Sequence, residues 1–185
     1  MPKSVKEKKT RLQNLLTRAE AGEAEAQYGL AMCYMMGTGV RKNAKKAVPW
    51  FLKSAEQGDA ASQCNLGFCY GNGKGVEKDA QQAAHWYRLA AEQGDAQAQF
   101  NLSVCYLTGQ GVAENDAEAR RWCLAAAEQG HADAQYNMGT IFLCGIGTPR
   151  DEKQAVLWYL RAAEQGHDSA QEALAALSDR LPEEL

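Results

Sequence analysis

The residues best suited to nucleophilic or metal chemistry in this sequence are its six cysteines and three histidines. Thiolates and imidazoles act as nucleophiles, bases or zinc ligands when they cluster, often as Cys-x-x-Cys or His-Glu-x-x-His. Neither pattern occurs here, and the sequence also lacks the Gly-x-Ser-x-Gly motif of serine hydrolases. We therefore expect no catalytic residue, no metal and no cofactor.

The spacing of the cysteines predicts packing residues instead. Cys33, Cys69 and Cys105 lie 36 residues apart, at equivalent positions of an internal repeat. Stacked helices separate equivalent backbones by more than the ~7 Å that a disulfide spans. The other three have no obvious mate: Cys64, Cys123 and Cys144. We interpret all six as small buried packing residues.

The whole chain is built on this 36-residue period. Near copies of AEQGDAQAQFNLSVCYLTGQGVAENDAEARRWCLAA, residues 91–126, precede and follow it. A fifth start, at Ala163, runs out after half a unit, as expected for a terminal cap of an array. The predicted full repeats are 19–54, 55–90, 91–126 and 127–162. An N-terminal capping helix at 4–21 and a C-terminal half-repeat at 163–181 complete one predicted domain, 1–185.

Each repeat predicts two helices, which we call helix A and helix B. Helix A begins at a capping position and ends at two glycines spaced two apart, such as Gly109 and Gly111, which suit a turn with positive φ. The helix A capping positions are Glu23, Asp59, Asp95 and His131. Helix B starts near Asn43, Asp79, Asn115 or Asp151, and it carries an Ala three residues before a Trp. The small residue allows close approach, and the Trp is predicted to fill the core.

The histidines fit this scheme without catalysis. His131 and His167 replace the capping Asp of their column, meaning the set of residues at one position of successive repeats. His85 lies on a predicted helix B. We interpret the two replacements as exposed helix caps and not as general bases.

Charge is distributed unevenly along the chain. Residues 1–53 carry 11 Lys and Arg against 4 Asp and Glu, whereas residues 54–185 carry 9 against 19. The densest basic segment, RKNAKK at 41–46, is interpreted as solvated surface because no stacking aromatics or recognition helix accompany it. We expect no nucleic-acid binding. No signal peptide or membrane-length apolar segment is evident, which predicts a cytoplasmic protein without membrane insertion.

The pattern AEQGxAxAQxNLGxxYxxGxGVxxDxxxAxxWYxxAA, over residues 19–181, resembles the Sel-one-like repeat (SLR), a relative of the tetratricopeptide repeat. The resemblance implies an all-α solenoid, a right-handed α-α superhelix that presents helix A on a concave surface. Members of the family usually act as adaptors in signalling or assembly complexes, in bacteria often at the envelope or in host interaction.

By the same resemblance, a partner-binding groove is expected on helix A. Three columns and an Asn ladder would offer side chains and amides to a bound segment. The first column is Tyr28, Cys64, Phe100 and Tyr136, the second is Met32, Phe68, Val104 and Thr140, and the third is Met35, Gly71, Leu107 and Leu143. The predicted groove residues are Tyr28, Met32, Met35, Asn65, Phe68, Phe100, Asn101, Val104, Leu107, Tyr136, Asn137 and Leu143. The alternative is that the aromatics pack between repeats and that the Asn residues bond to neighbouring turns. The Lys or Arg of the tetratricopeptide carboxylate clamp is missing from these columns.

The predicted function is a non-catalytic scaffold or adaptor that binds a protein or peptide partner, as a monomer or weak dimer. Two alternatives stay open. One is a hydrolase of the cysteine-rich SLR kind, which a cluster of Cys or His in a closed pocket would favour. The other is a structural spacer that works through its ends, which exposed apolar surface at the terminal half-repeats would favour.

Overall fold

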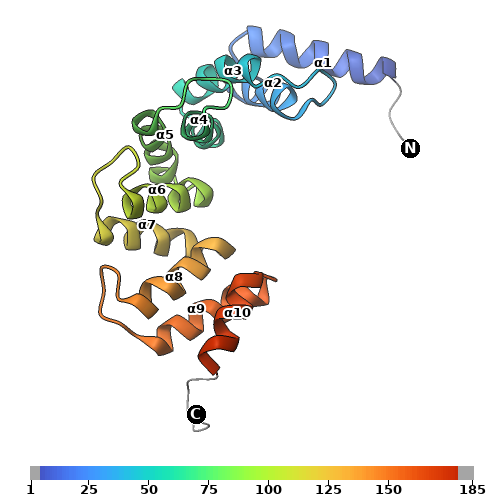
Figure 1. Ribbon diagram of the computed structural model, residues 1–185. Helices are drawn as coiled ribbons and strands as arrows, with labels where there is room; N and C mark the ends of the chain where they lie inside the picture. The colour runs from blue at the N-terminus through green and yellow to red at the C-terminus, as the bar shows by residue number, and fades with distance from the viewer. Residues whose placement is uncertain (1–4, 179–185) are drawn as a thin grey trace. The chain divides into compact units, whose positions relative to one another are not determined.

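The computed structural model describes residues 5–178, which fold into helices joined by turns and contain no strand (Figure 1). The chain divides into two compact units, residues 1–95 and 96–185. The first unit contains α1 (Val5–Glu20), α2 (Ala24–Met36), α3 (Ala44–Glu56), α4 (Ala60–Asn72) and α5 (Ala80–Glu92). The second contains α6 (Ala96–Thr108), α7 (Asp116–Glu128), α8 (Ala132–Cys144), α9 (Glu152–Glu164) and α10 (Asp168–Ser178).

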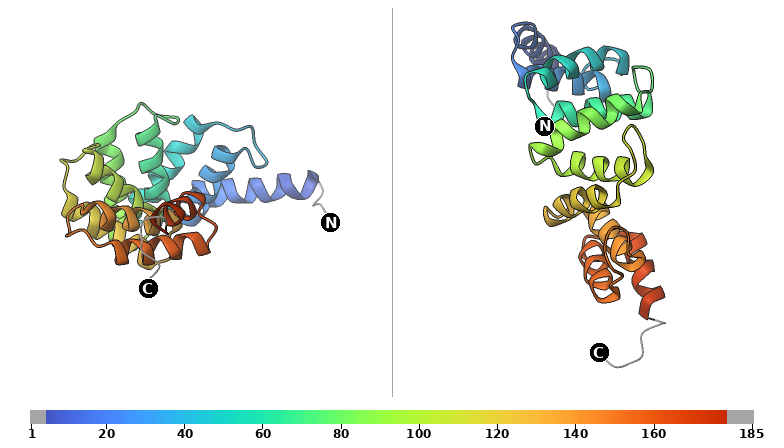
Figure 2. Two further views of the ribbon diagram at one scale, coloured as in Figure 1. Left: turned by 60° about the horizontal axis from the view of Figure 1, so that its bottom comes forward. Right: turned by 90° about the vertical axis from the view of Figure 1, so that its left-hand side faces the viewer.

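Within each unit, helix A and helix B of a repeat lie side by side as a hairpin (Figure 2). The hairpins are α2 with α3, α4 with α5, α6 with α7, and α8 with α9. The predicted all-α repeat fold is confirmed. At the ends, α1 lies within the predicted helix 4–21 and α10 within the predicted half-repeat 163–181. Residues 4 and 179–181 of those predictions lie outside the described range.

The predicted starts of helix B are confirmed by their caps. Each capping side chain accepts a hydrogen bond from the backbone N–H three residues later, which satisfies an amide that the helix leaves free. The four bonds are Asn43 with Lys46 (3.1 Å), Asp79 with Gln82 (3.0 Å), Asn115 with Glu118 (3.1 Å) and Asp151 with Gln154 (3.0 Å). Asp59 caps helix A of the second repeat in the same way, at 2.7 Å from the Ser62 nitrogen.

The glycine pairs end helix A as predicted, and the second glycine has an additional role. Gly73 (φ 64°) ends α4, and Gly75 (φ 84°) follows in the loop. A Cβ on Gly75 would lie 2.5 Å from the carbonyl carbon of Ala44, at the start of α3. In the second unit, Gly147 approaches the backbone of Asp116 in the same manner. The loop of one repeat therefore packs directly against the start of the preceding helix B.

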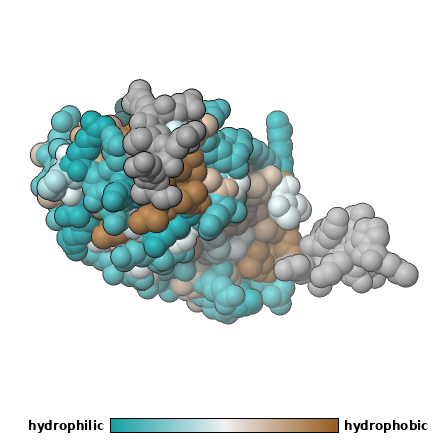
Figure 3. Space-filling view, turned by 90° about the horizontal axis from the view of Figure 1, so that it is seen from below, coloured by the Kyte–Doolittle hydropathy of each residue, from teal (hydrophilic) through white to brown (hydrophobic). Residues whose placement is uncertain are grey.

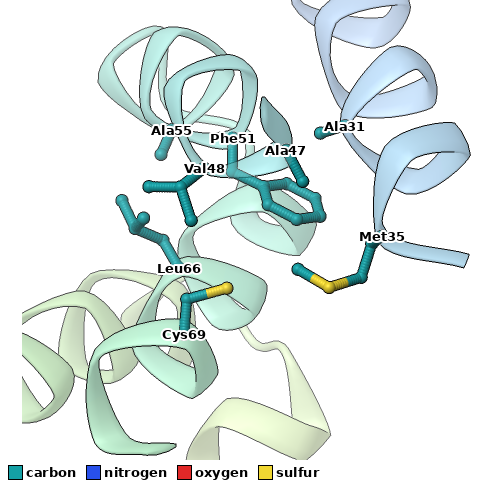
Figure 4. Close-up of a cluster of buried hydrophobic side chains, with 8 residues drawn as sticks. All are labelled: Ala31, Met35, Ala47, Val48, Phe51, Ala55, Leu66 and Cys69. Carbon is teal, nitrogen blue, oxygen red and sulfur yellow. The ribbon is translucent and has the colours of Figure 1, made fainter. Parts of the chain in front are cut away.

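The core lies between the helices of successive repeats. Figure 4 shows the cluster of the first unit, in which the fully buried Phe51 is surrounded by side chains from α2, α3 and α4. Trp86 of α5 packs against this cluster, and Trp158 of α9 joins the corresponding cluster of α7 and α8. The helix B tryptophans are therefore packing residues, as predicted.

A polar ladder accompanies this core, and it explains the recurrent AEQG and AQ strings. Gln57, just after α3, donates from Nε2 to Oε1 of Gln27 at 2.7 Å, and Gln27 in turn donates to the carbonyl of Ala19 at 3.2 Å. The same side-chain pair recurs in Gln93 with Gln63, Gln129 with Gln99, and Gln165 with Gln135. The acceptor glutamine is buried in all four pairs, so each pair ties the end of helix B to helix A of the same hairpin in the interior.

Candidate partner-binding surface

The first predicted groove column packs against the cap of the next helix A. In the second unit, Phe100 stacks on His131 with ring centroids 4.8 Å apart and an interplanar angle of 21°. Tyr136 stacks on His167 at 4.8 Å and 15°. Each pair is 31 residues apart in sequence. One face of each aromatic ring is therefore occupied by its own chain, in agreement with the packing alternative.

The two histidines are helix caps, as predicted, although both are half-buried and not exposed. Nδ1 of His131 accepts from the Ala134 N–H (3.3 Å), and Nδ1 of His167 accepts from the Ala170 N–H (3.2 Å). Nδ1 accepts only when it carries no proton, which places the hydrogen of the neutral ring on Nε2. Nε2 then lies 3.2 Å from Oε1 of Gln97 in the first case and 3.2 Å from Oδ1 of Asp133 in the second.

In the first unit, Tyr28 and Cys64 take the place of the stacked aromatics, and Asp59 and Asp95 take the place of the histidines. Burial, together with the charge and the hydrogen bond of Asp95, raises the pKa of the Cys64 thiol to about 12. Burial also raises the pKa of Tyr28, with a smaller contribution from the Asp59 carboxylate. In the first unit, the Cys64 thiol thus faces the acidic cap Asp95. At the equivalent position of the second unit, the Phe100 ring faces the histidine cap His131.

The second predicted column stays open in every repeat. Met32, Val104 and Thr140 are half-buried, and Phe68 is 41% exposed, which is unusual for a phenylalanine. The Lys74 ammonium lies 5.1 Å from the centroid of the Phe68 ring. Phe68 therefore presents an apolar ring to solvent with a cation beside it, whereas Met32 packs against the core cluster and Thr140 is hydrogen-bonded to Tyr159.

The residues of the third predicted column differ in how deeply they are buried. Met35 is only 6% exposed and lies in the core between α2, α3 and α4, so it is not available to a ligand and we do not include it in the proposed surface. Leu107 and Leu143 are half-buried, and Leu143 packs against the cluster of α9 and α10.

The Asn ladder bonds mainly to its own helices. Asn65 donates to the carbonyl of Ala61 at 2.8 Å, one turn earlier. Asn101 accepts from Nε2 of Gln97 at 3.3 Å, also within its helix. Asn137 is half-buried. These contacts agree with the alternative in which the ladder bonds to neighbouring turns.

The repeat pattern and this helical geometry match a known family. A family model described as the Sel1 repeat matches residues 24–59, 60–95, 96–131 and 132–167. The chain belongs to the Sel1 repeat family. The matched repeats begin at helix A, and the boundary between the two units falls between the second and third of them.

Solved structures of Sel1 proteins resemble the chain in sequence and fold. A protective antigen of uropathogenic Escherichia coli with an SLR fold is 41% identical over 91% of this chain, with a TM-score of 0.88. A Sel1 repeat protein from Oxalobacter formigenes is 34% identical over 90%, with a TM-score of 0.82. Cysteine-rich protein B of Helicobacter pylori is 25% identical over 71%, with a TM-score of 0.56 and 95% of its own chain covered. No curated protein matches the sequence.

Sel1 repeat proteins are generally protein-interaction scaffolds, and the fold is typically non-enzymatic. This Sel1 chain spans 36% of the length of the Escherichia coli protein and 66% of that from Oxalobacter formigenes.

Among the described helices, none combines the length and the hydrophobicity needed to span a bilayer. The face drawn in Figure 3 is mostly hydrophilic, with hydrophobic side chains gathered in a few patches.

The thiols of these Sel1 repeats are held as free cysteines. Burial raises the pKa of Cys69 to about 11 and that of Cys123 to about 12, which suppresses the nucleophilic thiolate. Four of the six are buried packing residues as predicted, whereas Cys33 is half-buried and Cys144 is exposed. Over residues 5–178, no group of three or more His, Cys, Asp or Glu side chains is arranged to hold a metal ion.

Proposed function

We propose that this Sel1 chain is a non-catalytic adaptor that binds a segment of a partner protein on its helix A surfaces. The observation that carries the proposal is the open second column, in which no residue is buried in any of the four repeats and Phe68 is 41% exposed. In the first unit the surface comprises Tyr28, Met32, Asn65 and Phe68. In the second it comprises Phe100, Asn101, Val104, Leu107, Tyr136, Asn137 and Leu143.

The chemistry of the first unit supports an acidic partner with an apolar anchor. Residues 1–95 carry 14 Lys and Arg against 10 Asp and Glu, a net charge of +4, whereas residues 96–185 carry 6 against 13, a net charge of −7. Lys74 beside the Phe68 ring would pair with a carboxylate next to an apolar side chain that covers the ring. The resemblance to proteins of Escherichia coli and Oxalobacter formigenes supports a bacterial setting, in a signalling, envelope or host-interaction complex.

The proposal is tested by affinity capture from the native lysate with four proteins: the wild type, Phe68→Glu, Leu107→Glu and Leu157→Glu. Leu157 is 50% exposed on α9, a helix B, and therefore controls for the same chemical change away from helix A. Circular dichroism first establishes that all four are folded.

We expect the same partner on the wild type and on Leu157→Glu, and about a tenfold loss or more on at least one helix A variant, because a groove anchor contributes about 2 kcal/mol. Equal capture by all four proteins would overturn the helix A proposal.

A second candidate, a spacer that works through its ends, is favoured by one specific observation. Leu160 is 44% exposed on α9, the last described helix B before the C-terminal half-repeat.

A further inference from the structure

Three of the four helix B tryptophans pack against clusters of helices that precede them. Trp50 packs against a cluster of α1 and α2, Trp86 against the cluster of α2, α3 and α4, and Trp158 within that of α7 and α8. For Trp86 and Trp158, the cluster includes the preceding helix B, α3 and α7 respectively.

On α3, the residues of the cluster that meets Trp86 include Val48, Leu52 and Ala55. Val48 and Ala55 are buried, and Leu52 is half-buried.

The same three residue types recur on α9, three periods later, as Val156, Leu160 and Ala163. No described helix B follows α9, and the burial changes accordingly. Val156 and Ala163 are only half-buried, and Leu160 is 44% exposed. The apolar set on α3, from the cluster against which Trp86 packs, is thus repeated on α9. There Val156 and Ala163 pack only against the cluster of α9 and α10, and Leu160 is exposed.

Helix α10 also has an uncovered position. In the other repeats, the residue that follows the helix B tryptophan packs against the equivalent position of helix A. Helix A carries a small residue in one column, Ala31, Gly67, Ser103 and Gly139, and all four are buried. Tyr87 of helix B lies against Gly67, and Tyr159 lies against Gly139, each so close that an added Cβ would overlap the ring. The fifth member of the column, Ala175 on α10, is exposed.

The glutamine ladder ends at the same place. Gln27, Gln63, Gln99 and Gln135 are buried, and each accepts from a glutamine that follows helix B of its own repeat. Gln171, the next member of this column, lies on α10 and is exposed. Within residues 5–178, three columns, one apolar, one of small residues and one of amides, are therefore without the helix B that follows them in the other repeats.

We propose that these residues, Val156, Leu160 and Ala163 of α9 with Gln171 and Ala175 of α10, form a docking site, the terminal seat, for a helix of the helix B type from another polypeptide. The occupant carries Trp followed by an aromatic residue, then a small pair and Glu-Gln, as in Trp86, Tyr87 and the AAEQ segment at 90–93. The Trp enters the apolar residues of α9, the aromatic residue covers Ala175, and the Gln donates to Gln171. Ala31, which has the same methyl group as Ala175, shows that an alanine fits beneath such a helix.

A second copy of this chain is a poor occupant in its native form. Its own helices B are already packed in their hairpins. Its end helix α1 has Asn14 at the position of the tryptophan, one period before Trp50. The complementary surface is instead that of α5, because Trp86 of α5 packs against the cluster to which Val48 and Ala55 belong, and the seat repeats these residue types.

The test uses a peptide of residues 79–95, acetylated, amidated and labelled with a fluorophore, titrated with the full 185-residue chain. Fluorescence anisotropy reports binding, and amide hydrogen exchange reports where the peptide binds. We expect saturable binding, with increased protection confined to α9 and α10. A Trp86→Ala peptide and a Leu160→Glu chain should each weaken binding about tenfold or more.

Leu157→Glu is the matched control, since its column (Pro49, His85, Arg121, Leu157) is exposed in all four repeats and lies outside the seat. Leu160 is itself exposed, so its variant should fold, and its thermal unfolding is compared with that of Leu157→Glu. Three results would overturn the proposal: no saturable binding up to about 1 mM peptide, equal weakening by both variants, or protection outside α9 and α10.

Discussion

Replacing Gly75 with alanine should destabilise the first unit much more than the same change at Gly39. Both glycines follow the end of a helix A and have positive φ, 84° and 76°. An alanine in this left-handed region costs about 1–2 kcal/mol, partly offset by about 0.4–1 kcal/mol of lost freedom in the unfolded chain. Among the described residues, no atom lies within 4 Å of the position that a Cβ on Gly39 would take, so Gly39→Ala should cost about 1 kcal/mol from the strained backbone alone.

At Gly75, a steric clash adds to the free-energy cost of the strained backbone. Its Cβ would lie 2.5 Å from both the carbonyl carbon and the oxygen of Ala44, and 2.9 Å from the Lys45 nitrogen. These are backbone atoms at the start of α3, which cannot rotate away as a side chain could. Forcing such an overlap typically costs about 1–3 kcal/mol, which brings Gly75→Ala to about 2–4 kcal/mol.

Equilibrium urea unfolding followed by far-ultraviolet circular dichroism measures both variants against the wild type. The midpoint should shift for Gly75→Ala by at least twice the shift for Gly39→Ala, with similar slopes. If the two units unfold in separate transitions, both variants should shift the midpoint of the transition of residues 1–95, since repeats contact only their neighbours. Equal shifts, or a larger one for Gly39→Ala, would refute the close approach of the loop to α3.

Three further predictions concern individual side chains. A double-mutant cycle of Phe100→Ala and His131→Ala should give a coupling free energy of about 0.5–1.5 kcal/mol from ring stacking, and a value near zero would contradict it. Alkylation of the native chain, mapped by mass spectrometry, should modify exposed Cys144 first and Cys123, with its pKa raised to about 12, only after unfolding; early labelling of Cys123 would disagree. Pro49, exposed inside α3, removes a helix hydrogen bond, so Pro49→Ala should raise the free energy of unfolding by up to about 3 kcal/mol, and a lower melting temperature would exclude this reasoning.

The features that could be predicted from the sequence are local and repeated. A cap such as Asn43 acts on an amide three residues away, and a glycine such as Gly73 acts on its own backbone, so both are visible in a short window. Four aligned copies then separate the constant positions from the variable ones. For the same reason, the role of Trp86 as a packing residue was predictable although its contacts were not.

The pairings between distant residues could not be predicted from local pattern. The Gln57–Gln27 bond within one hairpin and the Phe100–His131 stack join residues 30 and 31 positions apart, and nothing in a short window indicates the partner. A signal does exist for the stack, because an aromatic residue and a histidine cap occur together in two repeats, whereas Cys64 faces Asp95 in another. Membership of a column is also insufficient to predict whether a side chain is buried, since Met35 is buried while Leu107, in the same column, is half-buried.

The terminal seat shows why identical residues can have different roles in a repeat protein. Val48 and Ala55 are buried on α3, in the cluster against which Trp86 packs, whereas Val156 and Ala163 are half-buried and Leu160 is exposed on α9, after which no further helix B is described. Stability in such arrays is a sum of repeats and of the interfaces between neighbours. An interface that one repeat uses for folding is therefore available for binding at the last repeat. This makes the two proposed sites separable: Leu160→Glu should abolish docking of the helix B peptide and leave partner capture through Phe68 unchanged, whereas Phe68→Glu should do the reverse.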